Sequence, residues 1–309
     1  MTDVAAVVIG VLKFYFTWIF EVIVSFIPVK PKDVSKDIVL ITGGGSGFGH
    51  LLAVKFAKLG STLILWDINA QGLQETKEQI VKNGGKCHTY VCDICNRNEV
   101  YEIAEKVKKE VGNVTILVNN AGIAYSASFL KLNDENIERT FQVNTLSHFW
   151  TCKAFLPSML NSNSGHIVSI ASVASFAGIP KLSDYSASKA AAASFMESLF
   201  LELQLSGKNN IKLTAVCPYF MNTGMFAGSE SSFMKNLEPE YAADIAMKGI
   251  LRNEIFVTIP KTLLIPYALK PILPPKAGVE MIKLLGIDTA LDNFVGRHKV
   301  SLNNNTNEK

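Results

Sequence analysis

The chain has 309 residues, 48% of them hydrophobic and 18% charged, which is enough apolar material for one large core. Its net charge of +3 comes from 30 basic and 27 acidic residues, a near balance that argues against a nucleic-acid partner. Five cysteines without a regular framework argue against a disulfide-rich secreted domain and favour a reducing compartment. Cys92 and Cys95 form one C-x-x-C, but no second pair follows at matching spacing, so we expect no metal site.

The first segment, Val4 to Pro28, is apolar except for Lys13 and Glu21. A helix of about 25 residues can cross a hydrocarbon layer of about 30 Å, so residues 1–30 are predicted to form a membrane anchor. The length of the segment and the lack of a preceding basic region disfavour a cleavable signal peptide. Each charge costs on the order of 3 kcal/mol at the bilayer centre, so a spanning helix, a hairpin and an in-plane helix all remain open. Positive charge follows the segment, at Lys30, Lys32 and Lys36, which favours a cytosolic position for the rest of the chain.

From Asp37 onward, apolar β-branched runs alternate with amphipathic helical stretches. The predicted strands are residues 38–42, 62–66, 116–118, 166–170 and 212–216. This alternation is typical of a parallel sheet that is covered by helices on both faces. We therefore predict an α/β fold with a single Rossmann-type doubly wound parallel sheet over residues 37–260.

A glycine-rich turn, Gly43-Gly44-Gly45-Ser46-Gly47-Phe48-Gly49, joins the first strand to a predicted helix at residues 51–59. Glycine lets the backbone turn tightly and lets a pyrophosphate approach, while the helix N-terminus points at the anion. A glycine cluster alone is weak evidence, because a flexible turn has the same composition. The order of strand, glycine turn and helix is what favours a dinucleotide site.

The second strand ends at Asp67, 18 residues after Gly49. A carboxylate in this position can accept hydrogen bonds from the adenosine ribose hydroxyls. A 2′-phosphate would meet a like charge there, and neither the glycine turn nor Ile68 and Asn69 supplies a cation. The sequence therefore predicts NAD as the cofactor, against the alternative that Asp67 is an ordinary surface acid.

Three motifs occur in order: the T-G-x-x-x-G-x-G turn that starts at Thr42, Asn119-Asn120-Ala121-Gly122, and Tyr185-x-x-x-Lys189. With them the chain resembles the short-chain dehydrogenase/reductase family over about residues 37–260. The resemblance implies a sheet of about seven parallel strands with the active site at their carboxyl ends. It also implies a cofactor-binding set, comprising Thr42, Gly43, Ser46, Gly47, Phe48, Gly49, Asp67, Asp93, Asn119, Ala121, Gly122, Tyr185, Lys189, Pro218 and Thr223.

Some of these positions have particular expected roles by the same resemblance. Asp93 should contact the adenine, and Thr223 should meet the nicotinamide carboxamide. The family usually has glycine after the proline of the sixth strand, whereas Pro218 is followed by Tyr219, which leaves the local turn conformation open.

Tyr185 and Lys189 lie four residues apart in a predicted helix, so their side chains share one face. A free phenol has a pKa near 10, and we expect the nearby ammonium, together with the cationic nicotinamide, to lower the pKa of Tyr185. An isolated Tyr/Lys pair of this spacing is more often an exposed helix surface. Within the combination of motifs we predict Tyr185 as the acid/base of a hydride transfer. The resemblance adds two catalytic residues, Ser172 to orient the substrate oxygen and Asn144 to relay protons through a water to the lysine.

The C-terminal part, residues 261–309, combines apolar runs with several prolines and lysines and ends in a polar tail at residues 303–309. This composition predicts short, broken, amphipathic helices on an anionic membrane surface near the active-site mouth; an ordinary C-terminal lid is the alternative. Either arrangement favours a lipophilic substrate.

Within the family, the chain is most similar to microsomal retinol dehydrogenases of the epidermal retinol dehydrogenase 2 type. The residues that carry this likeness include Leu65 to Asn69 and Thr223 to Phe226. It implies oxidation of all-trans-retinol. The expected location is the endoplasmic reticulum membrane or lipid droplets. Members of the family often form homodimers, so a homodimer is also expected. Membrane 17β-hydroxysteroid dehydrogenases share much of the pattern, so a steroid or another lipid alcohol stays open. A cofactor-binding membrane scaffold is the alternative from a different functional class.

Overall fold

The computed structural model describes residues 4–25, 27 and 29–296. Pro28, the last residue of the predicted anchor, and the predicted polar tail at 303–309 lie outside the described residues. The chain divides into two compact units, residues 1–32 and 33–309.

The first unit contains one helix, α1 (Val4–Ser25). By length and composition, the stretch Val4–Val24 could cross a membrane, and none of it is buried within the protein. Its exposed side chains include Phe14, Trp18 and Ile23. The length and the exposed apolar side chains of α1 agree with the predicted anchor, and the membrane contact itself stays a prediction.

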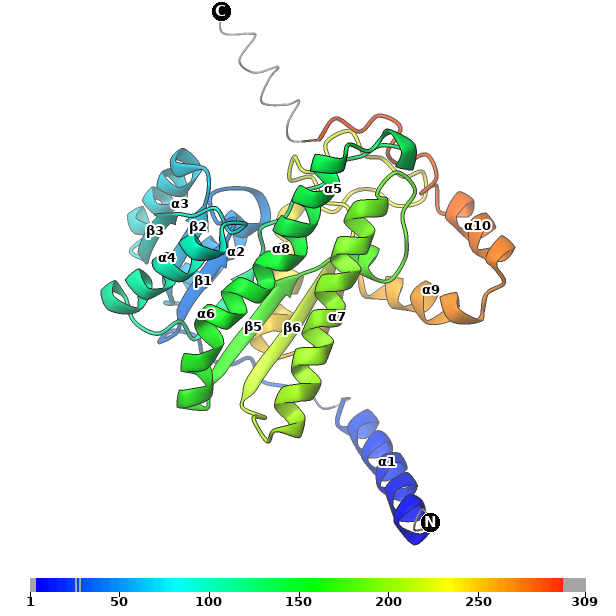
Figure 1. Ribbon diagram of the computed structural model, residues 1–309, viewed down its shortest axis with the longest axis horizontal. Helices are drawn as coiled ribbons and strands as arrows, with labels where there is room; N and C mark the ends of the chain where they lie inside the picture. The colour runs from blue at the N-terminus through cyan, green and yellow to red at the C-terminus, as the bar shows by residue number, and fades with distance from the viewer. Residues whose placement is uncertain (1–3, 26, 28, 297–309) are drawn as a thin grey trace, which may run out of the picture. The chain divides into compact units, whose positions relative to one another are not determined.

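The second unit is built on a seven-stranded, entirely parallel sheet in the order β3-β2-β1-β4-β5-β6-β7 (Figure 1). The strands are β1 (Ile38–Thr42), β2 (Thr62–Asp67), β3 (Lys86–Val91), β4 (Ile116–Asn119), β5 (Gly165–Ile170), β6 (Ile211–Pro218) and β7 (Phe256–Ile259). The chain order reverses between β1 and β4, where a doubly wound sheet places its ligand crevice. The predicted α/β class and strand number are confirmed.

Helices cover both faces of the sheet, which explains why the central strands are apolar at consecutive positions. Val39 and Ile41 of β1 pack with α2, α3 and α8, whereas Leu40 packs on the opposite face with α4, α6 and α7. The helices of these layers are α2 (Gly47–Lys58), α3 (Ala70–Lys82), α4 (Arg97–Glu110), α6 (Ser147–Ser162), α7 (Ser183–Leu205) and α8 (Pro239–Leu251). Helix α2 begins four residues before the predicted start, because Gly47 to His50 already form its first turn.

The helical segment that contains Asn144 is interrupted. Helix α5 (Asp134–Phe141) runs into a π-helical turn, η2 (Gln142–Leu146), and then into α6. Single π-turns within helices are rare and are frequent at functional sites.

After β7 the chain forms short helices, as predicted for this proline-rich part. These are η4 (Lys261–Leu263), α9 (Leu264–Leu269), η5 (Lys270–Ile272) and α10 (Pro275–Leu284), of which α9 and α10 are orange in Figure 1. Leu264, Ile265 and Ile272 expose large apolar side chains. The exposed apolar surface agrees with amphipathic helices, although the membrane contact itself stays a prediction.

Candidate active site

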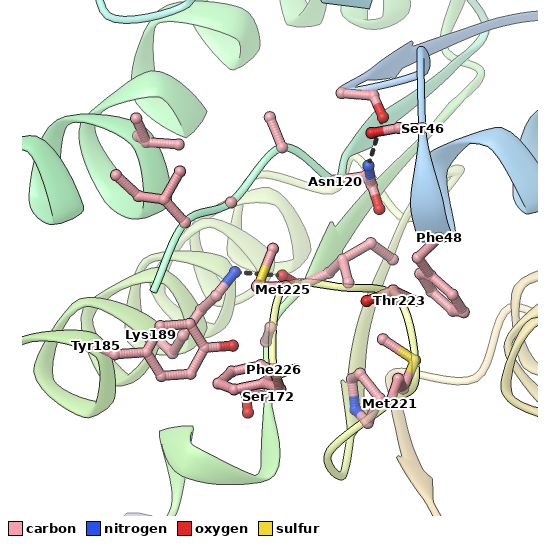
Figure 2. Close-up of a pocket in the computed structure, with 18 of the residues that line it drawn as sticks. Ser46, Phe48, Asn120, Ser172, Tyr185, Lys189, Met221, Thr223, Met225 and Phe226 are labelled. Carbon is pink, nitrogen blue, oxygen red and sulfur yellow. Dashed lines mark hydrogen bonds between the residues drawn. The ribbon is translucent and has the colours of Figure 1, made fainter. Parts of the chain in front are cut away.

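A cavity of about 270 Å³ lies at the carboxyl ends of the strands. Most of the predicted site residues line it, namely Gly43, Ser46, Phe48, Asp67, Asp93, Ala121, Gly122, Ser172, Tyr185, Lys189, Pro218 and Thr223. Figure 2 shows Tyr185, Lys189 and Ser172 at one end, Ser46 and Asn120 at the other, and Thr223 between them. One cavity thus joins the predicted catalytic group to the predicted nucleotide cradle.

The glycine positions of the turn leave little room for a side chain. Gly43 and Gly47 have φ of +66° and +56°, the left-handed region that glycine tolerates. A Cβ atom on Gly49 would lie 2.2 Å from the Gly43 carbonyl oxygen, and one on Gly45 would lie 3.0 Å from Asp67 Oδ2. This narrow cradle includes the first turn of α2, so its geometry fits a pyrophosphate at a helix N-terminus.

Asp67 is held by backbone amides at the end of β2. Its Oδ2 accepts a 3.0 Å hydrogen bond from the Gly45 N–H, and its Oδ1 accepts a 3.0 Å hydrogen bond from the Asn69 N–H. The carboxylate therefore joins the glycine turn to the start of α3. Fixed in the cavity wall, it fits the ribose of an adenosine and would repel a 2′-phosphate.

Five predicted residues do not line the cavity: Thr42, Gly47, Gly49, Asn119 and Asn144. Thr42 Oγ1 accepts hydrogen bonds from the Asn120 and Ala121 N–H groups, at 3.0 and 3.1 Å, and thereby ties β1 to the end of β4. Asn119 turns toward α6, where its Oδ1 accepts a 2.7 Å hydrogen bond from Thr151. The Thr42 and Asn119 side chains thus hold in place the strand ends that form the cavity wall.

Asn120 and Arg139 are among the lining residues that were not predicted individually. Asn120 Nδ2 donates to the Thr42 carbonyl oxygen at 2.8 Å and so completes the junction between β1 and β4. Arg139 of α5 forms an ion pair with Asp93, with its Nη2 3.2 Å from Asp93 Oδ2. Arg139 lies 46 residues from Asp93, so no local signal in the sequence pointed to this pair.

Tyr185 and Lys189 project from α7 into the cavity, and both side chains are buried. Lys189 Nζ donates a 2.8 Å hydrogen bond to the Ile170 carbonyl oxygen and lies 5.8 Å from the centre of the Tyr185 ring. Ser172 follows β5, and its Oγ accepts from the Ala174 N–H at 3.1 Å. The three groups converge because α7 packs against the end of β5.

Burial is the main cause of the pKa shifts of Tyr185 and Lys189. It raises the pKa of Tyr185 to about 12, although the Ser172 hydroxyl opposes the rise by hydrogen bonding. Burial also lowers the pKa of Lys189 to about 8. This direction is opposite to the predicted lowering of the Tyr185 pKa, but that lowering included the positive charge of a bound oxidised nicotinamide and stays a prediction for the cofactor-bound protein.

Asn144 occupies the π-helical turn and is fully buried. Its Oδ1 accepts from the Ile123 N–H at 2.9 Å, while its Nδ2 donates to the Ile123 carbonyl at 3.0 Å and to Ser188 Oγ at 3.1 Å. A Cβ atom on Gly122 would lie 3.4 Å from both Asn144 Oδ1 and Lys189 Nζ. Asn144 thus clamps the loop after β4 close to the lysine.

Apolar side chains form the wall beside Tyr185, among them Phe220, Met225 and Phe226. The Phe226 ring meets the Tyr185 ring edge to face at 5.5 Å. The turn left open at Pro218 is resolved: Tyr219 N–H donates to the Ile259 carbonyl at 2.9 Å and so continues the β6–β7 pairing, with φ outside the left-handed region. No glycine is required there.

Comparisons with known proteins agree with this arrangement. The family profile described as short chain dehydrogenase matches residues 37–232. Short-chain dehydrogenase/reductase family 16C member 6 of Bos taurus is 47% identical over 93% of this chain and 92% of its own. Human epidermal retinol dehydrogenase 2 is 44% identical over 93% and 94%, and human 17-beta-hydroxysteroid dehydrogenase 13 is 40% identical over 98% and 100%.

Solved structures share the fold. A short-chain dehydrogenase/reductase from Burkholderia phymatum in complex with NAD has a TM-score of 0.71 at 25% identity and covers 77% of this chain and 94% of its own. A short-chain dehydrogenase from Sphingobium yanoikuyae in complex with NADPH has a TM-score of 0.69 at 28% identity, covering 80% and 96%. Both nicotinamide cofactors thus occur on this fold.

Proposed function

Because the chain belongs to the short-chain dehydrogenase/reductase family, whose members are NAD(P)-dependent oxidoreductases, we propose that it oxidises a lipophilic alcohol with NAD. All-trans-retinol is the proposed alcohol, with retinal as the product. The observation that carries the proposal is the single cavity in which Tyr185, Lys189 and Ser172 face an apolar wall. A polar reacting group beside apolar side chains suits an alcohol with a hydrocarbon body.

The proposed cofactor set is the cavity wall from the glycine turn to Thr223, and Asp67 supports NAD. Its carboxylate is fixed by two backbone amides, so it cannot turn away from a 2′-phosphate without losing both hydrogen bonds. Among the lining residues the cations are Arg139 and Lys189, of which Arg139 is paired with Asp93. Neither is free to neutralise an added phosphate group.

In the proposed reaction, Tyr185 Oη takes the hydroxyl proton of the alcohol while the carbinol carbon loses hydride. The cavity wall from the glycine turn to Thr223 would hold NAD, which would supply the hydride acceptor and, in its oxidised form, a positive charge that favours the phenolate. Ser172 would hold the substrate oxygen, where charge develops in the transition state. Lys189 stabilises the tyrosinate, and Asn144 would pass protons through a water to the lysine. Reduction of the aldehyde runs through the same steps in reverse.

The proposed substrate is supported by the names of similar proteins. Epidermal retinol dehydrogenase 2 is named for retinol, and this chain is 44% identical to it over 93% of the chain. A 17β-hydroxysteroid is the second candidate, since 17-beta-hydroxysteroid dehydrogenase 13 aligns with 98% of the chain at 40% identity. Both are apolar alcohols, so both suit the wall beside Tyr185.

We further propose that residues 1–30 anchor the protein in the endoplasmic reticulum membrane or on lipid droplets, with residues 37–260 as a cytosolic catalytic domain. Support comes from α1, which is apolar, exposed and long enough to cross a bilayer. The lysines that follow it favour the cytosolic side for the catalytic domain. Residues 261–309 would contact the membrane and the substrate. Homodimerisation through α7 is an expectation from the family.

The test is a panel of all-trans-retinol, a 17β-hydroxysteroid and no added alcohol, each with NAD and with NADP, on membranes that carry the protein. The proposal predicts retinol-dependent NADH formation that exceeds the steroid and NADP rates. Preferential turnover of the steroid would favour the second candidate. Binding of NAD without turnover of any lipid alcohol would favour a membrane scaffold.

A further inference from the structure

A second cavity of about 1020 Å³ adjoins the active site. Residues 173–187 form one wall, and α9, η5 and α10 form the other. The lining is mostly apolar and includes Phe233, Met234, Leu273, Met281 and Ile282. Its size is at the upper end of the roughly 300–1,000 Å³ that ligand pockets occupy.

The two cavities share part of their wall: Val173, Ile179, Tyr219 and Phe220 line both. Val173 follows Ser172 directly, and Ser186, which lines the second cavity, follows Tyr185. The large cavity thus begins beside the groups that would hold the reacting oxygen. The hydrocarbon body of an alcohol held at Tyr185 would therefore have this cavity as its nearest large apolar space.

Specific contacts attach the C-terminal wall to the opposite wall. Lys270 Nζ donates a 2.9 Å hydrogen bond to the Phe176 carbonyl oxygen, and the Tyr267 ring packs 5.3 Å from the Phe176 ring. Lys181 also forms an ion pair with Asp292. These contacts join residues about 90 to 110 positions apart, so the second cavity is a built feature of the fold.

Two glycines line this cavity from opposite walls. Gly178 precedes α7, and Gly278 lies in α10. A Cβ atom added to either would meet nothing within 4 Å, and neither has positive φ. A larger side chain at either position would therefore enter open space without backbone strain.

We propose that this cavity holds the apolar tail of the substrate and that Gly178 and Gly278 set the longest tail it accepts. The inference deepens the proposed alcohol oxidation and rests on it. The substrate class is an alcohol with its hydroxyl at one end of a single long hydrocarbon or polyene chain. A compact alcohol would leave most of the cavity unfilled.

The test uses the full-length protein in membranes or detergent with primary alcohols of increasing chain length and with all-trans-retinol. In Gly278→Leu and Gly178→Leu, the ratio of kcat/KM for long against short alcohols should fall at least about tenfold, since a few misplaced methylenes cost this much. Gly278→Ala should give an intermediate ratio. Ala277→Leu adds the same bulk on the same helix at an exposed position outside the lining and should leave the ratio unchanged.

Retinol binding, followed by its own fluorescence, separates the two proposals. Weaker retinol binding in Gly278→Leu, without turnover of any alcohol by the wild type, would support the tail site and remove the proposed reaction. Wild-type chain-length ratios and wild-type retinol binding in both leucine variants, at unchanged melting temperature, would overturn the tail site.

Discussion

Lys189 Nζ donates a 2.8 Å hydrogen bond to the carbonyl oxygen of Ile170, the last residue of β5. This contact fixes the ammonium beside Tyr185, yet burial lowers the pKa of Lys189 from 10.5 to about 8. The same burial that shapes the site therefore makes the charge of its lysine costly to the folded protein.

The first prediction concerns stability against pH. Between about pH 8 and 10.5 the unfolded chain keeps a proton on Lys189 that the folded chain releases, so the unfolding free energy rises with pH. From about pH 7.5 to 9.5, the unfolding free energy of the wild type should rise by about 2 kcal/mol more than that of Lys189→Met. The pKa of Tyr185 is raised from 10.0 to about 12, so its titration changes the unfolding free energy mainly above pH 10, outside this range.

Urea unfolding of both proteins at several pH values measures this difference. Parallel pH profiles for wild type and Lys189→Met would contradict the shifted lysine. Tyr185→Phe, which keeps the lysine and removes only the hydroxyl, is the control and should follow the wild-type profile.

The second prediction concerns cofactor choice. Asp67→Ala combined with Ile68→Arg removes the carboxylate and adds a guanidinium at an exposed residue of the cavity wall. The ratio of kcat/KM for NAD against NADP should fall at least about a hundredfold, since a bidentate phosphate pair replaces a repulsion. Ile68→Arg alone is the control and should give a smaller fall. An unchanged ratio in the double variant would show that Asp67 does not face the adenosine ribose.

The third prediction concerns Asn144. In Asn144→Ala the partly buried N–H and carbonyl of Ile123 both lose their partner, which should cost about 2 kcal/mol of unfolding free energy. Asn144→Asp keeps the acceptor but loses the donor, so we expect an intermediate loss. Gln142→Ala in the same turn is the control. Equal unfolding midpoints in urea for wild type and Asn144→Ala would contradict the clamp.

Much of the fold was predictable because its determinants are local. The run Ile38–Thr42 is a strand because five consecutive apolar or β-branched residues suit a position buried on both faces. The glycine turn was predictable for a similar reason, since the φ of Gly43 favours glycine and the close approach at Gly49 leaves no room for a Cβ atom.

Features that depend on contacts between distant segments could not be predicted from the sequence. The contacts of Asn144 with Ile123 and of Asn119 with Thr151 join segments that lie 21 and 32 residues apart in the chain. The Arg139–Asp93 pair likewise joins distant segments. The spacing of Tyr185 and Lys189 shows the nearby ammonium but not the burial of the phenol, which raises the pKa of Tyr185 in the folded protein without its cofactor.

The fourth prediction concerns the anchor. Leu12→Lys with Ile19→Lys adds two charges to α1, each costing about 2.5–3.5 kcal/mol at a bilayer centre. The double variant should leave the membrane fraction on alkaline carbonate extraction, whereas the wild type should stay. Leu59→Lys with Val81→Lys, at exposed positions of the second unit, is the matched control and should stay as well. Retention of the α1 variant would argue against a membrane-spanning helix.

The most direct test of the account is NADH formation from all-trans-retinol by membranes that carry either the wild type or Tyr185→Phe. We expect retinol-dependent NADH formation by the wild type and a loss of about a hundredfold or more in the variant, because the phenol is the proposed acid/base. NAD binding should be retained in both. Equal retinol oxidation by the two proteins would contradict the central role of Tyr185.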